Sequence, residues 1–289
     1  MPVAIAIALL VVASVLFHIF SPWWQTPLAS NWGAIDSALN ITLWICGAVF
    51  VALNLFLAHT IWRYRNRPDH KAHYEPENPK LEKQLTLITA VGIIGMLAPG
   101  LWAWNQFITV PKDATIVEAV GQQWQWSFRY PGPDGVLGAA AVKHMTPENP
   151  LGLDPLDPFG RDDILAEGNE LHLPAGQPVK LVLRSKDVLH NFYVSEFRAK
   201  MDLVPGIVTY FWMTPTIRGK FDVLCAELCG VGHHEMRASV VVDSTKNYQS
   251  WLAQQASFEQ VMAQANPNSL AAILATSNAC YAPAAWSNP

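Results

Sequence analysis

The stretch Cys225-Ala-Glu-Leu-Cys229-Gly-Val-Gly-His233-His-Glu-Met236 brings two thiols, an imidazole and a thioether into one short segment. Soft donors of this kind suit copper, whereas structural zinc sites do not use methionine. Short β-rich runs at Phe221–Leu224 and Arg237–Val242 flank the segment, and its two glycines are expected to let it turn tightly. The sequence therefore predicts metal ligands in a loop between two strands of a β scaffold.

The two cysteines of this loop leave several kinds of site open. A Cys225–Cys229 disulfide is one alternative in an oxidising compartment, although His233 and Met236 would then stand at ligand spacing by accident. A one-copper site uses a single cysteine, so either one cysteine is spare or both bridge two metals. His190 is the candidate for a further ligand because it follows a predicted strand, whereas a surface or capping role is expected for His144, His172 and His234.

Short β-rich runs surround this loop in the second half of the chain. They alternate with Gly, Pro and Asp, which predicts a β-sandwich or Greek-key barrel. The predicted strands are Thr115–Val120, Trp124–Tyr130, Val179–Arg184, His190–Val194, Ile207–Thr214, Lys220–Leu224 and Arg237–Val242.

Two segments interrupt or follow the predicted strands. Residues 131–174 are rich in proline and carry eight acidic residues against Lys143 and Arg161. We interpret them as a long acidic surface insertion: a solvated loop, or a docking surface for a basic redox partner. After the last strand, Tyr248–Ala263 predicts a short amphipathic helix, and a flexible tail with the lone Cys280 follows it.

The first part of the chain has the composition of a membrane anchor. No Lys or Arg precedes Arg63, and three apolar stretches are long enough to span a bilayer: Val3–Phe20, Ala38–Ile61 and Leu85–Phe107. The first stretch is expected to be a retained helix, with a cleaved signal peptide as the alternative. Tryptophans near the ends of these stretches, Trp32 among them, are expected at the membrane interface.

Charge fixes the expected orientation. Six Lys and Arg residues lie between Arg63 and Lys83, whereas the connection Ser21–Ser37 has none. The basic loop is therefore expected in the cytoplasm, and the β domain outside the plasma membrane of a bacterium, in the periplasm. The formal net charge of −4 argues against a nucleic-acid partner. The expected organisation is an anchor over residues 1–110, a metal domain over 111–243 and a C-terminal region over 244–289.

These motifs together resemble subunit II of haem–copper cytochrome c oxidases, the subunit with the dinuclear CuA centre. The similarity extends over about Trp32 to Val242. The motifs that carry it are Gln123-Trp124-Gln125-Trp126-Ser127, Ser185-Lys186-Asp187-Val188-Leu189-His190, Lys200-Met-Asp202-Leu-Val-Pro205-Gly206 and the loop Cys225–Met236. The resemblance implies an α+β membrane protein, with transmembrane helices followed by a cupredoxin-like Greek-key β-barrel. It also implies a subunit of cytochrome c oxidase that is not itself the site of oxygen reduction.

The resemblance also implies a complete set of ligands for two copper ions. Both coppers would be bridged by Cys225 and Cys229. One copper would be completed by His190 and Met236, and the other by His233 and the backbone carbonyl of Glu227. Two bridging thiolates let one unpaired electron spread over both metals, which keeps the geometry nearly constant between redox states.

Other roles carried over by the resemblance concern partners and protons. Electrons from cytochrome c, or a similar small carrier, would enter at Trp124 and pass to haem in subunit I, where oxygen is reduced to water and protons are pumped. The Glu227 side chain would reach Mg²⁺ at the interface with subunit I. Glu82 would lie at the mouth of a proton-uptake channel, with an ordinary charged helix flank as the alternative. Membrane lipid and other oxidase subunits are further expected partners.

Three rival functions share some of these features. The copper-bearing subunit of a nitric oxide reductase would share the loop without needing Glu82. A quinol-oxidase anchor subunit would have no copper, which the five side-chain donors argue against. A copper-delivery protein would bind the metal reversibly and would not need membrane helices beside a rigid loop.

Overall fold

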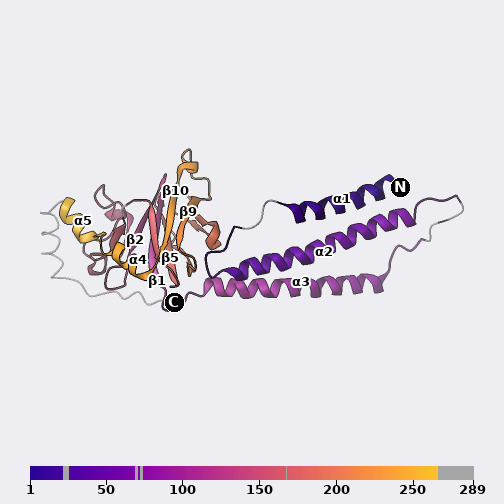
Figure 1. The fold of residues 1–289 in the computed structure, drawn as a ribbon, viewed down its shortest axis with the longest axis horizontal. Helices are drawn as coiled ribbons and strands as arrows, with labels where there is room; N and C mark the ends of the chain where they lie inside the picture. The colour runs from indigo at the N-terminus through magenta and orange to yellow at the C-terminus, as the bar shows by residue number, and fades with distance from the viewer. Residues whose placement is uncertain (22–25, 69–70, 72–73, 167, 266–289) are drawn as a thin grey trace. The chain divides into compact units, whose positions relative to one another are not determined.

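The computed structural model describes residues 1–21, 26–68, 71, 74–166 and 168–265. The chain divides into two compact units (Figure 1). One contains Met1–Pro27 and Gly33–Gln106, and the other contains Leu28–Trp32 and Phe107–Pro289. The first unit is helical, and the second carries all the β-strands of the described residues.

The helical unit consists of α1 (Pro2–Phe20), α2 (Gly33–Arg63) and α3 (Pro79–Ile108). All three are long and apolar enough to cross a membrane, as the sequence predicts. Both α2 and α3 extend beyond their apolar cores. Asn78 caps the start of α3 by accepting a hydrogen bond from the Leu81 N–H, and Pro79 occupies the first helical position, where its missing N–H costs nothing.

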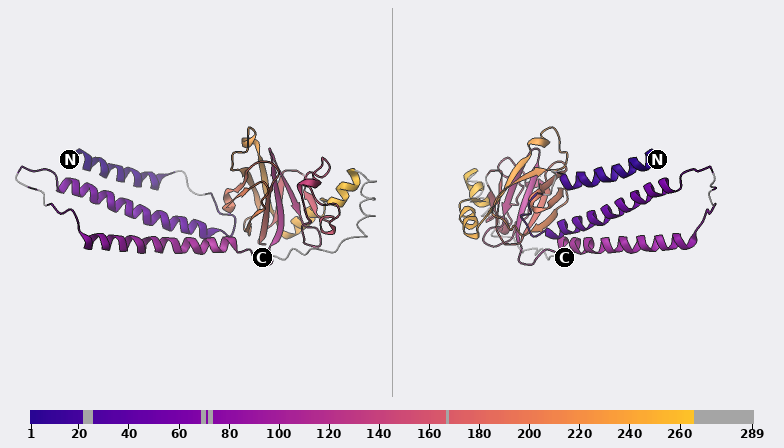
Figure 2. Two further views of the ribbon diagram at one scale, coloured as in Figure 1. Left: turned by 180° about the vertical axis from the view of Figure 1, so that it is seen from behind. Right: turned by 45° about the vertical axis from the view of Figure 1, so that its right-hand side comes forward.

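The second unit is built from two β-sheets, seen from two further sides in Figure 2. The strands of the six-stranded sheet follow the order β11 (Ala256–Ser257), β3 (Ile164–Ala166), β2 (Gln125–Tyr130), β1 (Thr115–Gln122), β5 (Val179–Ser185) and β8 (Thr209–Met213). Those of the five-stranded sheet follow the order β4 (Glu170–Pro174), β10 (Arg237–Asp243), β9 (Gly219–Cys225), β6 (His190–Val194) and β7 (Ala199–Leu203). Side chains of both sheets form a shared core, in which Phe128, Phe192 and Phe211 are fully buried.

All seven predicted strands are present, six of them with shifted ends, but four strands were not predicted: β3, β4, β7 and β11. Trp124 was predicted within a strand. It lies instead in the two-residue turn between β1 and β2, where Gln122 pairs with Gln125. The single predicted helix Tyr248–Ala263 is two helices, α4 (Thr245–Leu252) and α5 (Phe258–Ala265), because β11 pairs with β3 between them. The predicted flexible tail beyond Ala265, with Cys280, lies outside the described residues.

A short segment before α2 belongs to the β unit. The Ala29 N–H donates to the Glu196 carbonyl, and the Ser30 hydroxyl donates to the Phe197 carbonyl. The Trp32 indole donates to the Trp212 carbonyl, and only 2% of Trp32 is exposed. The Trp32 ring is therefore buried in the β unit, and its place at the membrane interface stays a prediction.

Much of the acidic segment 131–174 is folded against the sheets. Several of its carboxylates accept hydrogen bonds from backbone N–H groups of the same segment. Asp154 accepts from Leu156, and Asp157 accepts from Phe159 and Ala139. These acidic residues form turns. The interpretation of the whole segment as a solvated surface loop is wrong, since β3 and β4 belong to the sheets and Leu153 is fully buried.

A buried ion network ties this segment to β1, β2 and β5. The Arg129 guanidinium binds Glu118 at 2.8 Å and Asp163 at 2.7 Å, and Arg184 binds Glu118 at 3.0 Å. Burial acts to raise the pKa of Glu118, but the two arginines hold it below its usual value. For Asp163 burial outweighs the attraction of Arg129, and the pKa rises to about 7.

The raised pKa of Asp163 predicts a pH-dependent stability. The folded chain retains a proton on Asp163 up to a pH of about 7, whereas in the unfolded chain the Asp163 pKa has its ordinary value of 3.8 and the proton is lost above that pH. The folded state thus binds more protons between these values, so the free energy of unfolding should fall as pH rises through that window. Urea titrations at several pH values should show this fall in the parent chain and a flatter profile in Asp163→Asn. Parallel profiles for the two proteins would contradict the assignment.

Candidate metal centre

The metal loop connects β9 to β10, and backbone hydrogen bonds close it at its base. The Cys225 N–H donates to the Met236 carbonyl at 3.2 Å, and the Ala226 N–H donates to the Asn191 carbonyl of β6 at 3.1 Å. A 3₁₀ turn over His233–Glu235 orients the second half of the loop. The sheet therefore holds both ends of the ligand segment, as predicted for a loop between two strands.

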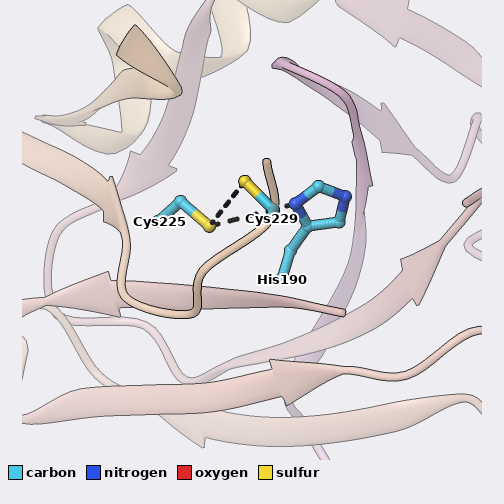
Figure 3. Close-up of side chains that lie close together, drawn as sticks. All are labelled: His190, Cys225 and Cys229. Carbon is cyan, nitrogen blue, oxygen red and sulfur yellow. Dashed lines mark hydrogen bonds between the residues drawn. The ribbon is translucent and has the colours of Figure 1, made fainter. Parts of the chain in front are cut away.

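Sulfur and nitrogen donors converge in this loop. The Sγ atoms of Cys225 and Cys229 are 3.8 Å apart, and both thiols are free. Cys225 Sγ lies 3.9 Å from His190 Nδ1, while Cys229 Sγ lies 3.5 Å from His233 Nδ1 and 3.8 Å from Met236 Sδ. Figure 3 shows the His190 ring, from the start of β6, directed at the two sulfurs.

Their spacing fits bound metal ions. With metal–sulfur bonds of about 2.3 Å and metal–nitrogen bonds of about 2.1 Å, a tetrahedral angle separates two sulfurs by about 3.8 Å and a sulfur from a nitrogen by about 3.6 Å. The observed separations of 3.5–3.9 Å match these values. His190, Cys225 and Cys229 also form a buried group whose donor atoms lie within 4.8 Å of one another. The donor set thus suits soft metals such as copper.

The predicted carbonyl ligand is also close. Cys225 Sγ lies 3.2 Å from the Glu227 carbonyl oxygen, whereas the Glu227 side chain is exposed. The structure therefore brings together all six residues predicted to bind metal: His190, Cys225, Glu227, Cys229, His233 and Met236.

The two thiols have very different acidities. Burial acts to raise the pKa of Cys225, but hydrogen bonds, first that with His190, lower it to about 6. Burial and then the neighbouring Cys225 sulfur raise the pKa of Cys229 to about 11. One thiolate is therefore ready to bind a cation at neutral pH, and the second thiol must lose its proton when a metal binds.

Asp187 orients the His190 ring, a role that the sequence did not reveal. Its Oδ1 lies 2.8 Å from His190 Nε2, so Nδ1 faces the sulfurs, and its Oδ2 accepts a hydrogen bond from the Gln123 N–H at 2.7 Å. A carboxylate on the outer nitrogen fixes the orientation of a ligand histidine. The only available signal was the three-residue spacing between Asp187 and His190.

Trp124 and Glu82 have contrasting surroundings. The Trp124 indole is 39% exposed and donates from Nε1 to the Cys229 carbonyl at 3.3 Å, so it is both accessible and next to the ligand loop. It is therefore not a core aromatic, unlike Trp126, which is 3% exposed. Glu82 is exposed in the first turn of α3, where the positive end of the helix dipole stabilises a carboxylate.

Comparisons with known proteins identify the family of the chain. The family model described as "Cytochrome C oxidase subunit II, periplasmic domain" matches residues 115–245. The alternative cytochrome c oxidase subunit 2 of Bradyrhizobium diazoefficiens is 58% identical over 258 residues, which cover 89% of this chain and 93% of that protein. The cytochrome c oxidase subunit 2 of Cereibacter sphaeroides is 26% identical over 79% of this chain and 77% of its own length.

Among solved structures, the chain is similar to the periplasmic domain of cytochrome oxidase subunit II from Bradyrhizobium japonicum. The identity is 28%, the TM-score is 0.37, and the match covers 50% of this chain and 95% of that one. The predicted fold class, apolar N-terminal helices followed by a cupredoxin-like β domain, is confirmed. The chain belongs to the cytochrome c oxidase subunit II family and is thus an oxidoreductase subunit of a haem–copper oxidase.

Proposed function

We propose that this chain accepts electrons at a dinuclear copper centre and passes them to haem in subunit I of a proton-pumping cytochrome c oxidase. The observation that carries the proposal is the convergence of two free thiols, two imidazoles, a thioether and a carbonyl in and around one loop. When bound, a copper pair supplies a one-electron redox couple. The 58% identity to an oxidase subunit supports the oxidase over a nitric oxide reductase.

Different residues of the chain would bind such a centre, orient its ligands and exclude water from it. Cys225 and Cys229 would hold both coppers through their sulfurs, and by resemblance His190 and Met236 would complete one copper and His233 and the Glu227 carbonyl the other. Asp187 keeps Nδ1 of His190 facing the sulfurs. Cys225, Cys229 and Met236 are at least 92% buried, which excludes water from the sulfur donors and lowers the cost of moving an electron.

The direction of electron flow requires the β domain outside the plasma membrane. Six cationic residues from Arg63 to Lys83, at the end of α2, in the connection and at the start of α3, favour that side by the positive-inside rule. The segment Leu28–Trp32, which connects α1 to α2, belongs to the β unit. This agrees with the α1–α2 connection and the β domain lying on the same side of the membrane. The proposed partners are subunit I, other oxidase subunits, membrane lipid and a small electron carrier such as cytochrome c.

Trp124 is the proposed point of electron uptake, and its replacement tests this route. In Trp124→Phe oxidase, reduction of the centre by a reduced carrier should slow by about ten- to hundredfold, since the indole and its contact with the Cys229 carbonyl are lost. Copper absorption and EPR spectra should stay unchanged. Trp102→Phe, an exposed tryptophan of α3, is the control. Unchanged uptake in Trp124→Phe would exclude this route.

Two roles rest on the resemblance alone. The role of Glu82 at the mouth of a proton channel would be refuted by normal proton uptake in Glu82→Gln oxidase. Mg²⁺ binding by Glu227 would be refuted if Glu227→Gln left the EPR signal of substituted Mn²⁺ unchanged.

A further inference from the structure

Gly232 lies directly against the indole ring of Trp124. A Cβ atom added at Gly232 would stand 2.5 Å from Cδ2, 2.7 Å from Cγ and 2.8 Å from Cε3 of that ring. Carbon atoms in contact are normally about 3.5 Å apart, so any side chain here would displace the ring by roughly an ångström. Gly232 is buried although both of its neighbours in the loop, Val231 and His233, are at least partly exposed.

The backbone at Gly232 does not itself require glycine. Its φ of −89° and ψ of 13° are accessible to other residues. Gly230, two residues earlier, has a φ of +121°, which other residues rarely adopt. The expectation that both glycines serve the tight turn is therefore incomplete. Gly230 serves the turn and also lies close to the Trp124 ring, whereas Gly232 makes room for that ring without a backbone need for glycine.

Hydrogen bonds fix the ring against the loop. Trp124 Nε1 donates to the Cys229 carbonyl at 3.3 Å, and Gln123 Nε2 donates to the same oxygen at 2.8 Å. The side chain of Cys229 belongs to the donor set. The indole thus reaches a ligand residue through one hydrogen bond, while 39% of Trp124 stays accessible to a partner.

We propose that Gly232 is a positioning residue for electron uptake: its missing side chain lets the Trp124 indole lie on the metal loop, bonded to the Cys229 carbonyl. The inference rests on the proposed role of Trp124. One electron leaves the reduced carrier, and the copper pair gains it, with no bond made or broken. Gly232 touches neither the carrier nor the metal in this scheme and acts through the ring alone.

A copper-free measurement tests the geometry. In the full chain in detergent with ¹⁵N-labelled tryptophan, the Trp124 indole N–H is the resonance that disappears in Trp124→Phe. Its exchange with solvent should be about tenfold faster in Gly232→Ala, because the hydrogen bond to Cys229 is broken. Val231→Ala, an 86% exposed neighbour, should exchange like the parent chain. Equal exchange in Gly232→Ala would overturn the proposal.

Electron uptake in the assembled oxidase tests the consequence. Gly232→Ala should slow reduction of the copper centre by a reduced carrier about ten- to hundredfold, with unchanged copper spectra. In a chain that already carries Trp124→Phe, Gly232→Ala should cause no further slowing. If electron uptake is slow in Trp124→Phe but normal in Gly232→Ala, this inference fails while the proposed function stands. If neither variant is slow, the Trp124 route itself fails.

A loss of copper from Gly232→Ala would still be informative. The same clash predicts that the double variant Gly232→Ala/Trp124→Ala binds copper again, since the displaced ring is gone. Persistent copper loss in the double variant would mean that Gly232 shapes the loop itself, contrary to the proposal.

Discussion

Cys229→Ser should reduce the copper content of the chain from two ions to at most one and abolish any EPR signal shared between two metals. Cys229 Sγ lies 3.8 Å from Cys225 Sγ, 3.5 Å from His233 Nδ1 and 3.8 Å from Met236 Sδ, so it contacts three other donors of the site. A serine oxygen is a hard donor and a poor bridge for copper. Copper analysis and EPR of the purified chain measure the change.

Cys46→Ser is the matched control for this variant. Cys46 is an exposed free thiol in α2, in the helical unit, so its replacement should leave copper content and spectra unchanged. If Cys229→Ser kept two coppers with the parent spectrum, Cys229 would not be a bridging ligand. If Cys46→Ser lost copper, the chain would hold metal outside the β domain.

Arg129→Met should lower the free energy of unfolding of the β domain by about 3–5 kcal/mol. Arg129 is 2% exposed and binds two buried carboxylates, Glu118 and Asp163. Methionine fills part of the space but leaves Asp163 without its cation, and Arg184 continues to neutralise Glu118. The midpoint of urea unfolding, followed by near-ultraviolet circular dichroism of the full chain in detergent, measures the loss.

Arg218→Met is the control for the loss of one positive charge. Arg218 is exposed after β8, and its replacement should change the free energy of unfolding by no more than about 0.5 kcal/mol. A similar small effect for Arg129→Met would show that the network contributes little to stability. A large effect would show that it anchors the segment 131–163, since Asp163 also accepts a hydrogen bond from the Gly138 N–H.

The features predictable from sequence were those with local signals. Long apolar runs identified α1, α2 and α3, and the donor types between Cys225 and Met236 identified the metal loop. His190 could be selected because it follows a predicted strand in the same β domain as that loop, and the resemblance then assigned it to one copper. These signals depend on residue type and spacing along the chain, which the sequence shows directly.

The features that escaped prediction depend on contacts between distant residues. The strands β3 and β4 lie among prolines and acidic residues, where only pairing with β2 and β10 makes them strands. The hydrogen bond from Trp32 to the Trp212 carbonyl joins residues 180 positions apart, so nothing in the sequence showed that its ring packs in the β unit. The two-residue turn at Gln123-Trp124 contains neither Gly nor Asn, the residues from which such turns are usually predicted. Gly232 looked like a turn residue because nothing in the sequence shows which ring covers it.

Metal analysis combined with EPR on the purified, oxidised chain examines the dinuclear assignment most directly. Two coppers per chain, with one unpaired electron coupled equally to both nuclei, is the result expected from two cysteine sulfurs 3.8 Å apart with imidazole and thioether donors beside them. A single copper with an electron confined to one nucleus, or a Cys225–Cys229 disulfide with no copper bound, would contradict it.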